Sequence, residues 1–457
     1  MMMKNTTIAA ISTAQAAAGI SVIRISGDVA IAIGDRVFRS KLNKKLSGMP
    51  GYTCTLGAAY DGEEMIDECI ATVFRAPHSY TGEDVVELSC HGGVYVTARI
   101  LRALYDAGAA AAEPGEFTMR AFLNGKMDLI EAESVMDIIS ARSRSAARAA
   151  LNVKEGALSR RIDAVKAQLL NKAAHLSAWA DYPEEDIPEV ENDALIAALT
   201  QAEAELNAVI KGFDNGRILR DGIDTAIIGK PNVGKSTLMN LLAGYDRSIV
   251  TSVAGTTRDV VEESVSLDDL VLNLSDTAGI RSTQDEVERI GVDKARSRLS
   301  SAALILCVFD ASSELSGEDR EIISAVGDAP AVAVLNKSDL PQKTDLSALQ
   351  SSFSHVIPMS AKNAEGIGEM IKAIKEVCAI GEFEPTSALV YNERQRTLAK
   401  SALNSVREAI SALDMGMTFD AVTVSIEDAI SALCELTGER VTDEVVDQVF
   451  HSFCVGK

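Results

Sequence analysis

The chain has 457 residues, of which 47% are hydrophobic and 24% charged, and its formal net charge is −22 at pH 7. This hydrophobic content is ample for packed cores and excludes an intrinsically disordered protein, while the length predicts about three domains. Free-standing nucleic-acid-binding proteins are usually basic, so any RNA contact of such an acidic chain must be local or delivered by a partner.

Seven cysteines are scattered along the chain without a CxxC pair. An odd, unpaired set is typical of reduced thiols in the cytoplasm and argues against a disulfide framework or a zinc site. No uncharged apolar run reaches the ~18 residues of a membrane helix. Polar residues interrupt the mild apolar stretch after Lys4, so we expect a retained cytoplasmic N-terminus and no membrane association.

Residues 1–118 are predicted to form an α+β domain. Gly/Pro turns separate short runs with strand-like patterns, and one amphipathic segment has helical spacing. The strand-like runs are 7–11, 21–25, 68–74 and 85–88, and the helix is expected near 94–107.

The pattern becomes helical over residues 119–216. Leu158, Ile162, Val165 and Leu169 recur at helical spacing. An acidic turn at 181–188 is followed by a helix over about 194–210, and residues 211–216 are predicted to be a linker. Helical spacing resumes over 382–457, so we expect one helical domain that the intervening segment interrupts.

Residues 217–381 alternate between apolar strand runs and helical runs, which predicts an inserted, doubly wound α/β domain. The strand runs end at positions 228, 274, 309, 335 and 357. In such folds the ligand groups lie beyond the carboxyl ends of the strands. Each of the nucleotide motifs at 229–236, 276–279, 336–339 and 360–362 follows such an end.

The sequence Gly-Lys-Pro-Asn-Val-Gly-Lys-Ser at 229–236 has the spacing of a phosphate-binding loop and joins a strand run to a helical run. Its glycines let backbone N–H groups approach a triphosphate, and the helix N-terminus adds partial positive charge. We expect Lys235 to reach the β- and γ-phosphates and Ser236 to hold Mg²⁺.

Further motifs follow in the order of a GTPase. The run at 255–259 (G-T-T-R-D) supplies a threonine for the Mg²⁺ shell; Asp276 can order a Mg²⁺-bound water, and Gly279 can offer its N–H to a γ-phosphate. Asp339 can accept two hydrogen bonds from guanine that adenine cannot donate. The segment 360–362 can support the guanine carbonyl, so the ordered set predicts GTP binding and hydrolysis.

Small signalling GTPases orient the attacking water with a glutamine directly after D-x-x-G, but this chain has Ile280 there. Asn232 and the loop 251–256 can instead hold a monovalent cation against the phosphates, where it would stabilise developing charge. The acidic stretch 285–288 offers a carboxylate to position water. A helix N-terminus that favours negative charge would explain the same residues.

Several sequence blocks span nearly the whole chain, and those of the N-terminal part and the C-terminal end carry a more specific signal than the nucleotide motifs. They are V-I-R-I-S-G at 22–27, Y-T-G-E-D-V-V-E-L-S-C-H-G-G at 80–93, residues 113–129, D-Y-P-E-E-D-I at 181–187, T-S-V-A-G-T-T-R-D at 251–259, D-E-V-E-R-I-G at 285–291 and the C-V-G-K end at 454–457. With these blocks the chain resembles the MnmE (TrmE) family of potassium-activated tRNA-modification GTPases.

The resemblance implies a tetrahydrofolate-binding, dimerising domain at 1–118, a helical domain in two parts (119–216 and 382–457) and an inserted G domain at 217–381. It implies a homodimer that joins an FAD-dependent MnmG-like partner and contacts tRNA mainly through that complex. The product would be carboxymethylaminomethyl- or aminomethyluridine at the wobble position U34. The implied cofactors are K⁺, Mg²⁺ and a 5-formyl- or 5,10-methylene-tetrahydrofolate.

Individual roles follow from the resemblance by matching position. The implied K⁺ ligands are Asn232, Thr251, Val253 and Thr256, the Mg²⁺ ligands are Ser236 and Thr257, Glu288 orients water, and the folate contacts are Arg24, Glu87, Lys126 and Lys457. Together with the motifs, the predicted GTP contacts are Asn232, Val233, Gly234, Lys235, Ser236, Thr237, Thr251, Ser252, Val253, Ala254, Gly255, Thr256, Thr257, Asp276, Thr277, Ala278, Gly279, Asn336, Lys337, Asp339, Ser360, Ala361 and Lys362.

Two features stay open at this level. Cys454 is a candidate nucleophile or one-carbon carrier, but a thiol that merely packs near a folate pocket is at least as well supported, since the sequence identifies no base to lower its pKa. In the loop 13–19, the stretch from Ala14 to Ala18 stands where the family usually has a Pro/Gly-rich sequence, which bears on folate affinity. The alternative functions are a ribosome-assembly GTPase and a regulatory GTPase without tRNA chemistry; neither has an evident use for the Cys-x-Gly-Lys end.

Overall fold

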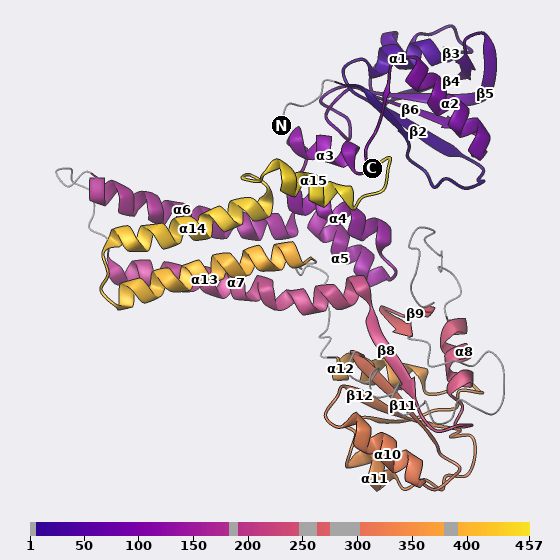
Figure 1. Ribbon diagram of the computed structural model, residues 1–457, viewed down its shortest axis with the longest axis vertical. Helices are drawn as coiled ribbons and strands as arrows, with labels where there is room; N and C mark the ends of the chain where they lie inside the picture. The colour runs from indigo at the N-terminus through magenta and orange to yellow at the C-terminus, as the bar shows by residue number, and fades with distance from the viewer. Residues whose placement is uncertain (1–5, 182–190, 246–262, 275–301, 379–391) are drawn as a thin grey trace. The chain divides into compact units, whose positions relative to one another are not determined.

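The computed structural model describes residues 6–181, 191–245, 263–274, 302–378 and 392–457 (Figure 1). The chain divides into two compact units. One comprises Met1–Met136, Lys154–Leu206 and Thr397–Lys457, and the other comprises Asp137–Val153 and Asn207–Arg396. Among the described residues, no helix combines the length and the apolar character needed to cross a bilayer.

The N-terminal part of the first unit is built on a seven-stranded sheet in the order β3-β4-β5-β6-β2-β1-β7. Neighbouring strands are antiparallel except for β1 and β7, which are parallel. The elements are β1 (Ile8–Ile11), β2 (Ser21–Ser26), α1 (Ala30–Val37), β3 (Phe38–Ser40), β4 (Thr53–Asp61), β5 (Glu64–Phe74), β6 (Val85–Cys90), α2 (Val94–Asp106) and β7 (Ala110–Ala111).

Four of these strands and α2 were predicted from the sequence pattern, and the structure confirms them. It adds α1, β3, β4 and β7, which the pattern did not predict. The β3–β4 contact shows why: Gly57 lies in β4 where a Cβ would collide with the Phe38 ring and the Arg39 carbonyl. Glycine has low strand propensity, so a strand that requires it for close approach is hard to recognise from its sequence.

Helices from distant parts of the chain pack together in the first unit. They include α3 (Glu116–Leu123), α4 (Leu129–Ser140), α6 (Ala157–Asp181), α14 (Phe419–Thr437) and α15 (Asp443–His451). Helices α6 and α14 lie side by side (Figure 1). The four positions predicted to share a face of α6, from Leu158 to Leu169, are all buried. The N-terminal and C-terminal helical segments therefore build one core, as an interrupted helical domain requires.

The prediction of a linker at residues 211–216 is wrong. Helix α7 (Asn192–Asp221) runs through this segment without a break and is followed directly by the first strand of the G domain. Two glycines suggest a linker, but each costs a helix only ~1 kcal/mol. Burial of Val209, Phe213 and Leu219 along the helix outweighs that cost.

The second unit contains a six-stranded sheet in the order β13-β12-β11-β8-β10-β9. All neighbours are parallel except β9 and β10. The strands are β8 (Ile223–Ile228), β9 (Glu263–Leu267), β10 (Leu270–Leu274), β11 (Leu304–Asp310), β12 (Ala331–Asn336) and β13 (Val356–Pro358). The helices are α8 (Lys235–Tyr245), α10 (Gly317–Val326), α11 (Leu346–Gln350) and α12 (Ile367–Val377). Two further α-helices of the described residues are α5 (Arg144–Lys154) and α13 (Glu393–Asp414).

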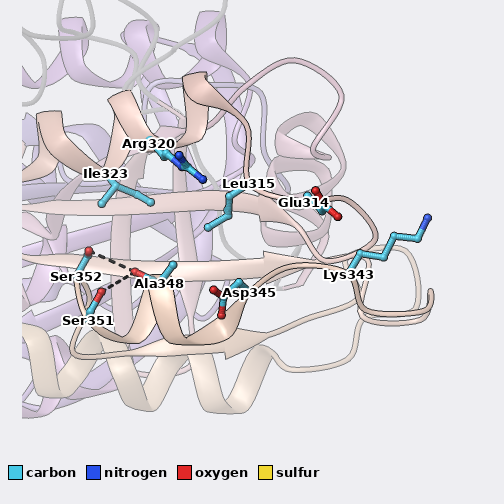
Figure 2. Close-up of a pocket in the computed structure, with 9 residues that line it drawn as sticks. All are labelled: Glu314, Leu315, Arg320, Ile323, Lys343, Asp345, Ala348, Ser351 and Ser352. Atoms are coloured by element: carbon cyan, nitrogen blue, oxygen red, sulfur yellow. Dashed lines mark hydrogen bonds between the residues drawn. The ribbon is translucent and has the colours of Figure 1, made fainter.

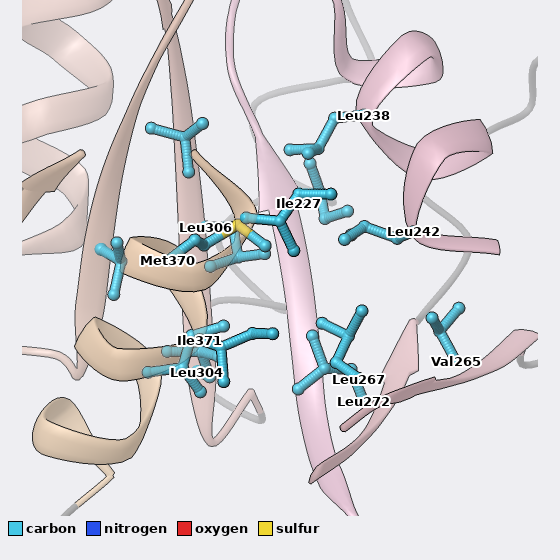
Figure 3. Close-up of a cluster of buried hydrophobic side chains, with 14 of the residues drawn as sticks. Ile227, Leu238, Leu242, Val265, Leu267, Leu272, Leu304, Leu306, Met370 and Ile371 are labelled. Carbon is cyan, nitrogen blue, oxygen red and sulfur yellow. The ribbon is translucent and has the colours of Figure 1, made fainter. Parts of the chain in front are cut away.

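Helices cover both faces of this sheet, which confirms the doubly wound fold. Leu304 and Leu306 of β11 point to a core shared with α8 and α12, and Figure 3 shows Leu238 and Leu242 of α8 facing Ile227 of β8. The alternate β11 residues join a second core with α10 and α11. Strands buried on both faces read as continuous apolar runs, which explains why their ends were predicted to within one residue.

Candidate functional site

The phosphate loop lies between the end of β8 and the start of α8. Gly234 has a φ of +98°, and a Cβ there would collide with the Asn336 side chain; a Cβ at Gly229 would collide with the Val308 carbonyl. Only glycine fits at positions so close to the neighbouring chain. The phosphate loop therefore packs closely against Val308 of β11 and Asn336 of β12 and leads into the N-terminus of α8.

Lys235 is held against this loop. Its Nζ donates to the carbonyl oxygens of Gly229 at 2.7 Å and of Lys230 at 2.8 Å. Burial lowers the pKa of Lys235 from its ordinary value. Ser236 and Thr237 follow on the first turn of α8, where both are exposed. The ammonium and the Ser236 hydroxyl thus flank the start of the helix, where an anion is stabilised.

Asn336 joins the phosphate loop to the segment after β13. Its Nδ2 donates to the Val233 carbonyl at 2.8 Å, and its Oδ1 accepts from the Ala361 N–H at 3.0 Å. Asp339 accepts a hydrogen bond of 2.8 Å from the Ser360 hydroxyl. Three loops far apart in the sequence thereby meet at the carboxyl ends of β8, β12 and β13.

Lys337 completes this junction. Its Nζ donates to the Asn232 carbonyl at 2.9 Å and to Asp310 Oδ2 at 2.6 Å. Burial alone would raise the pKa of Asp310, but the hydrogen bonds from Lys337 and Ser312 outweigh it, and the pKa lies below its ordinary value. Lys362 is exposed next to this junction in the chain.

The remaining predicted nucleotide and metal residues lie outside the described part of the chain. They are Thr251, Ser252, Val253, Ala254, Gly255, Thr256, Thr257, Asp276, Thr277, Ala278, Gly279 and Glu288.

The structure also shows site residues that the motifs did not supply. Asp310 is the last residue of β11, and the rule that ligand groups lie at strand ends would have found it. Lys230 Nζ donates to Asp319 Oδ2 at 2.7 Å, although the two residues are 89 positions apart in the sequence. A local sequence pattern cannot predict a pairing over such a separation.

A separate cavity of about 480 Å³ lies beside α10 and α11 (Figure 2). Its lining residues are Glu314, Leu315, Arg320, Ile323, Lys343, Asp345, Ala348, Ser351 and Ser352. None of them is a predicted nucleotide contact, and their charged side chains belong to exposed residues. This cavity is therefore not the predicted nucleotide site.

In the N-terminal domain, Arg24 and Glu87 are direct cross-strand neighbours on β2 and β6. The guanidinium donates twice to Glu87 Oε1, each time at 2.8 Å. It also lies over the rings of Tyr80 and Phe117, 5.2 and 5.6 Å from their centroids. Arg24 Nη1 is buried without a hydrogen-bond partner in the described structure. A buried donor in this state is costly, and a polar ligand would satisfy it.

The C-terminus of the chain reaches this pair. The Phe117 N–H donates to the Lys457 carbonyl at 3.2 Å, and Pro114 forms a β-bridge with Val455. A Cβ at Gly456, which has a φ of +96°, would collide with the Ile11 carbonyl. Burial, followed by the positive charge of Arg24, lowers the pKa of Lys457. The tail therefore brings Lys457 to the site of Arg24.

The other two predicted residues of this region are placed differently. Lys126 is exposed, and its Nζ donates to the Pro77 carbonyl at 3.0 Å; no contact with Arg24 is present among the described residues. Cys454 is exposed, and its carbonyl accepts from the Gly115 N–H at 3.3 Å.

A buried ion cluster supports α3, which carries Phe117. Arg120 bonds Glu83 at 3.1 Å and Glu116 at 2.7 Å, while Glu83 accepts from the Ser26 hydroxyl at 2.7 Å. Arg120 is 6% exposed. Buried charges persist when they are paired and hydrogen-bonded, so this cluster fixes the start of α3 against β2.

Comparison with known proteins places the whole chain. Residues 7–126 match the family model of the GTP-binding protein TrmE N-terminus, and residues 129–454 match that of the MnmE helical domain. The chain is 42% identical over 461 residues to the tRNA modification GTPase MnmE of Alkaliphilus metalliredigens, covering 100% of both chains. It is 41% identical over 457 residues to that of Enterococcus faecalis, covering 99% of this chain and 98% of the relative.

Solved structures of other GTPases match part of the chain. One is Era of Aquifex aeolicus bound to GDP·AlF₄⁻, which is 27% identical and is matched over 40% of this chain and 66% of that one, with a TM-score of 0.28. The family models and the full-length relatives agree with the nucleotide motifs and with the paired N-terminal and C-terminal segments. The chain belongs to the MnmE family of tRNA modification GTPases.

Proposed function

We propose that this protein is a potassium-activated GTPase that modifies C5 of the wobble uridine U34 of certain tRNAs, together with an FAD-dependent MnmG-like partner. Family membership makes it a GTP hydrolase of tRNA modification. The observation that best supports the finer proposal is the position of Lys457 beside the Arg24–Glu87 pair. It joins the Cys-x-Gly-Lys end to a polar, aromatic-lined site in the N-terminal domain.

The nucleotide would bind at the junction of the three strand-end loops. Backbone N–H groups of the phosphate loop would hold the phosphates together with Lys235, whose Nζ lies against the loop carbonyls of Gly229 and Lys230. Asp339 would accept from guanine while Ser360 fixes its carboxylate. Adenine lacks the matching donors, so a desolvated Asp339 would reject ATP.

Two metal ions would serve this site. Ser236 with Thr257 would hold Mg²⁺, and Asn232 with Thr251, Val253 and Thr256 would hold K⁺. When bound, these cations supply positive charge to the phosphates as they develop negative charge. Asn232 has a φ of 63° and is exposed at the loop. This exposure leaves its side-chain amide oxygen accessible as a K⁺ ligand. Glu288 would orient the attacking water.

A tetrahydrofolate derivative fits the N-terminal site. The Nη1 donor of Arg24 and the half-buried ammonium of Lys457 suit a carboxylate or the pterin carbonyl, and Glu87 suits the amino-imino edge of the pterin. Tyr80 and Phe117 add aromatic faces next to Arg24. We propose Lys126 as a further contact and Cys454 as a candidate reactive thiol.

The assembly would be a homodimer that contacts tRNA mainly through its partner. The net charge of −22 supports this division, because an acidic surface repels RNA phosphates. All seven cysteines are free thiols, which supports a cytoplasmic location.

The potassium proposal can be tested by measuring GTP hydrolysis in KCl and in NaCl at equal ionic strength. We expect fast turnover in K⁺ and slow turnover in Na⁺, with similar GTP affinity in both. Glu288→Ala should bind nucleotide normally and lose turnover in K⁺. Equal rates in the two salts would refute the cation-assisted mechanism and leave a GTPase that works by other means.

A further inference from the structure

The phosphate-loop motif does not specify which residue stands at position 230, yet the Lys230 side chain has a definite partner. Its Nζ donates to Asp319 Oδ2 at 2.7 Å and lies 3.5 Å from the Ser316 hydroxyl. The partner carboxylate belongs to the first turn of α10. The loop is therefore tied by a charged hydrogen bond to a helix on the face of the sheet opposite α8.

Asp319 does more than cap its helix. Its Oδ2 accepts from the Ser316 N–H and hydroxyl, both at 2.8 Å, which forms a capping box. Capping boxes normally satisfy a solvent-exposed helix end, but Asp319 is only 1% exposed. Its Oδ1 is buried without a hydrogen-bond partner in the described structure. A carboxylate so buried requires a counter-charge, and the Lys230 ammonium supplies it.

Lys230 also contacts Lys235, the residue expected to bind the phosphates. Its backbone carbonyl accepts from Lys235 Nζ at 2.8 Å. The second restraint on the loop lies two residues after Lys230, where Lys337 donates to the Asn232 carbonyl at 2.9 Å. Lys337 belongs to the guanine motif, whereas Asp319 belongs to no nucleotide motif. Asp319 is therefore a support for the loop that comes from outside the known machinery.

We propose that Asp319 is a positioning residue for nucleotide binding, which acts through Lys230 to hold the phosphate loop ready for phosphates. A loop that is ordered before binding avoids the entropy cost of being ordered during it. The loss should therefore appear in nucleotide affinity rather than in the rate of chemistry. This inference rests on GTP hydrolysis, which the family establishes, and is independent of the folate and potassium proposals.

The direct test is Asp319→Asn in the full-length chain, which removes the charge at nearly constant shape. Binding of fluorescent GDP and steady-state GTP hydrolysis in K⁺ would be measured. We expect the GDP Kd and the GTP KM to rise about threefold to tenfold, with kcat within about twofold of the unsubstituted protein. Asp345→Asn makes the same change at the exposed N-cap of α11 in the same unit, and it should leave all three constants unchanged.

Variants of Lys230 separate positioning from folding. Lys230→Arg keeps the charge and should retain affinity, whereas Lys230→Gln should weaken it as Asp319→Asn does. The double variant Lys230→Gln/Asp319→Asn should bind no more weakly than the weaker single variant, because both remove one contact.

Three results would overturn the inference. The first is that Asp319→Asn changes the GDP Kd and the GTP KM no more than Asp345→Asn does. The second is that the losses of affinity from Asp319→Asn and Lys230→Gln add fully in the double variant. The third is that kcat falls at constant KM, which indicates a loss of active protein. If Asp319→Asn does not fold, the comparison of Lys230→Arg with Lys230→Gln decides the question, and equal nucleotide affinities of these two variants would refute the proposal.

Discussion

At the scale of single residues, we propose that base selection depends on one carboxylate, that of Asp339. Asp339 is fixed by Ser360 at 2.8 Å and lies in the loop that Asn336 ties to the phosphate loop. Asp339→Asn exchanges an acceptor for a donor, so the complementary base is xanthine. We expect GTP affinity to fall by ~100-fold or more and xanthosine triphosphate to become the preferred ligand. Competition binding measures this, and continued preference for GTP would show that Asp339 does not read the base.

A second residue-scale prediction concerns the planar fork of Arg24. Arg24→Lys keeps the charge but loses the paired donors that contact Glu87 at 2.8 Å and the free Nη1 donor. We expect 5-formyl-tetrahydrofolate to bind about tenfold more weakly, as calorimetry would show. Arg102→Lys, an exposed residue of α2 that pairs with Asp106, is the matched control. Equal affinity of both variants would place the folate elsewhere.

At the scale of elements, a continuous helix α7 and a linker at residues 211–216 lead to different expectations for a proline substitution. Lys211 lies within α7, where proline removes a backbone hydrogen bond and clashes with the preceding turn. Lys211→Pro should destabilise this helix by ~3 kcal/mol, while Lys211→Ala should be neutral. Amide hydrogen exchange over residues 205–215 would report the change. Unchanged protection in the proline variant would restore the linker interpretation.

The start of α10 should respond to acid in a defined direction. Burial alone would raise the pKa of Asp319, but the hydrogen bonds from Lys230 and Ser316 hold it below the ordinary 3.8. A lowered folded-state pKa gives stability that is complete above the unfolded value and is lost as the pH falls through the folded value. The Tm gap between the unsubstituted protein and Asp319→Asn should therefore be constant above about pH 5 and shrink below about pH 4. A gap that widens in acid would contradict this assignment.

At the scale of the whole molecule, the sequence predicted what depends on local pattern. Five strands of the G domain were predicted from their apolar runs, and the phosphate loop from the fixed spacing of its glycines and lysine. Strand β9 was missed because its burial alternates along 264–267, so it lacks a continuous apolar run. Elements built from alanine and glycine, such as β4 around Gly57, gave no such pattern. Contacts across long sequence separation were also hidden, as the Lys230–Asp319 pair shows.

The two ends of the chain and the two helical segments meet in the first compact unit. The C-terminal segment returns to the N-terminal domain, where Lys457 meets Arg24, and the helical segments on either side of the G domain share one core.

The central claim is that GTP hydrolysis by this chain supports wobble uridine modification. Mass spectrometry of tRNA nucleosides from cells that lack the protein tests it most directly. We predict that carboxymethylaminomethyl- and aminomethyluridine-type nucleosides disappear, that the unsubstituted gene restores them, and that Glu288→Ala does not. Normal levels of these nucleosides in the deletion strain would contradict the account.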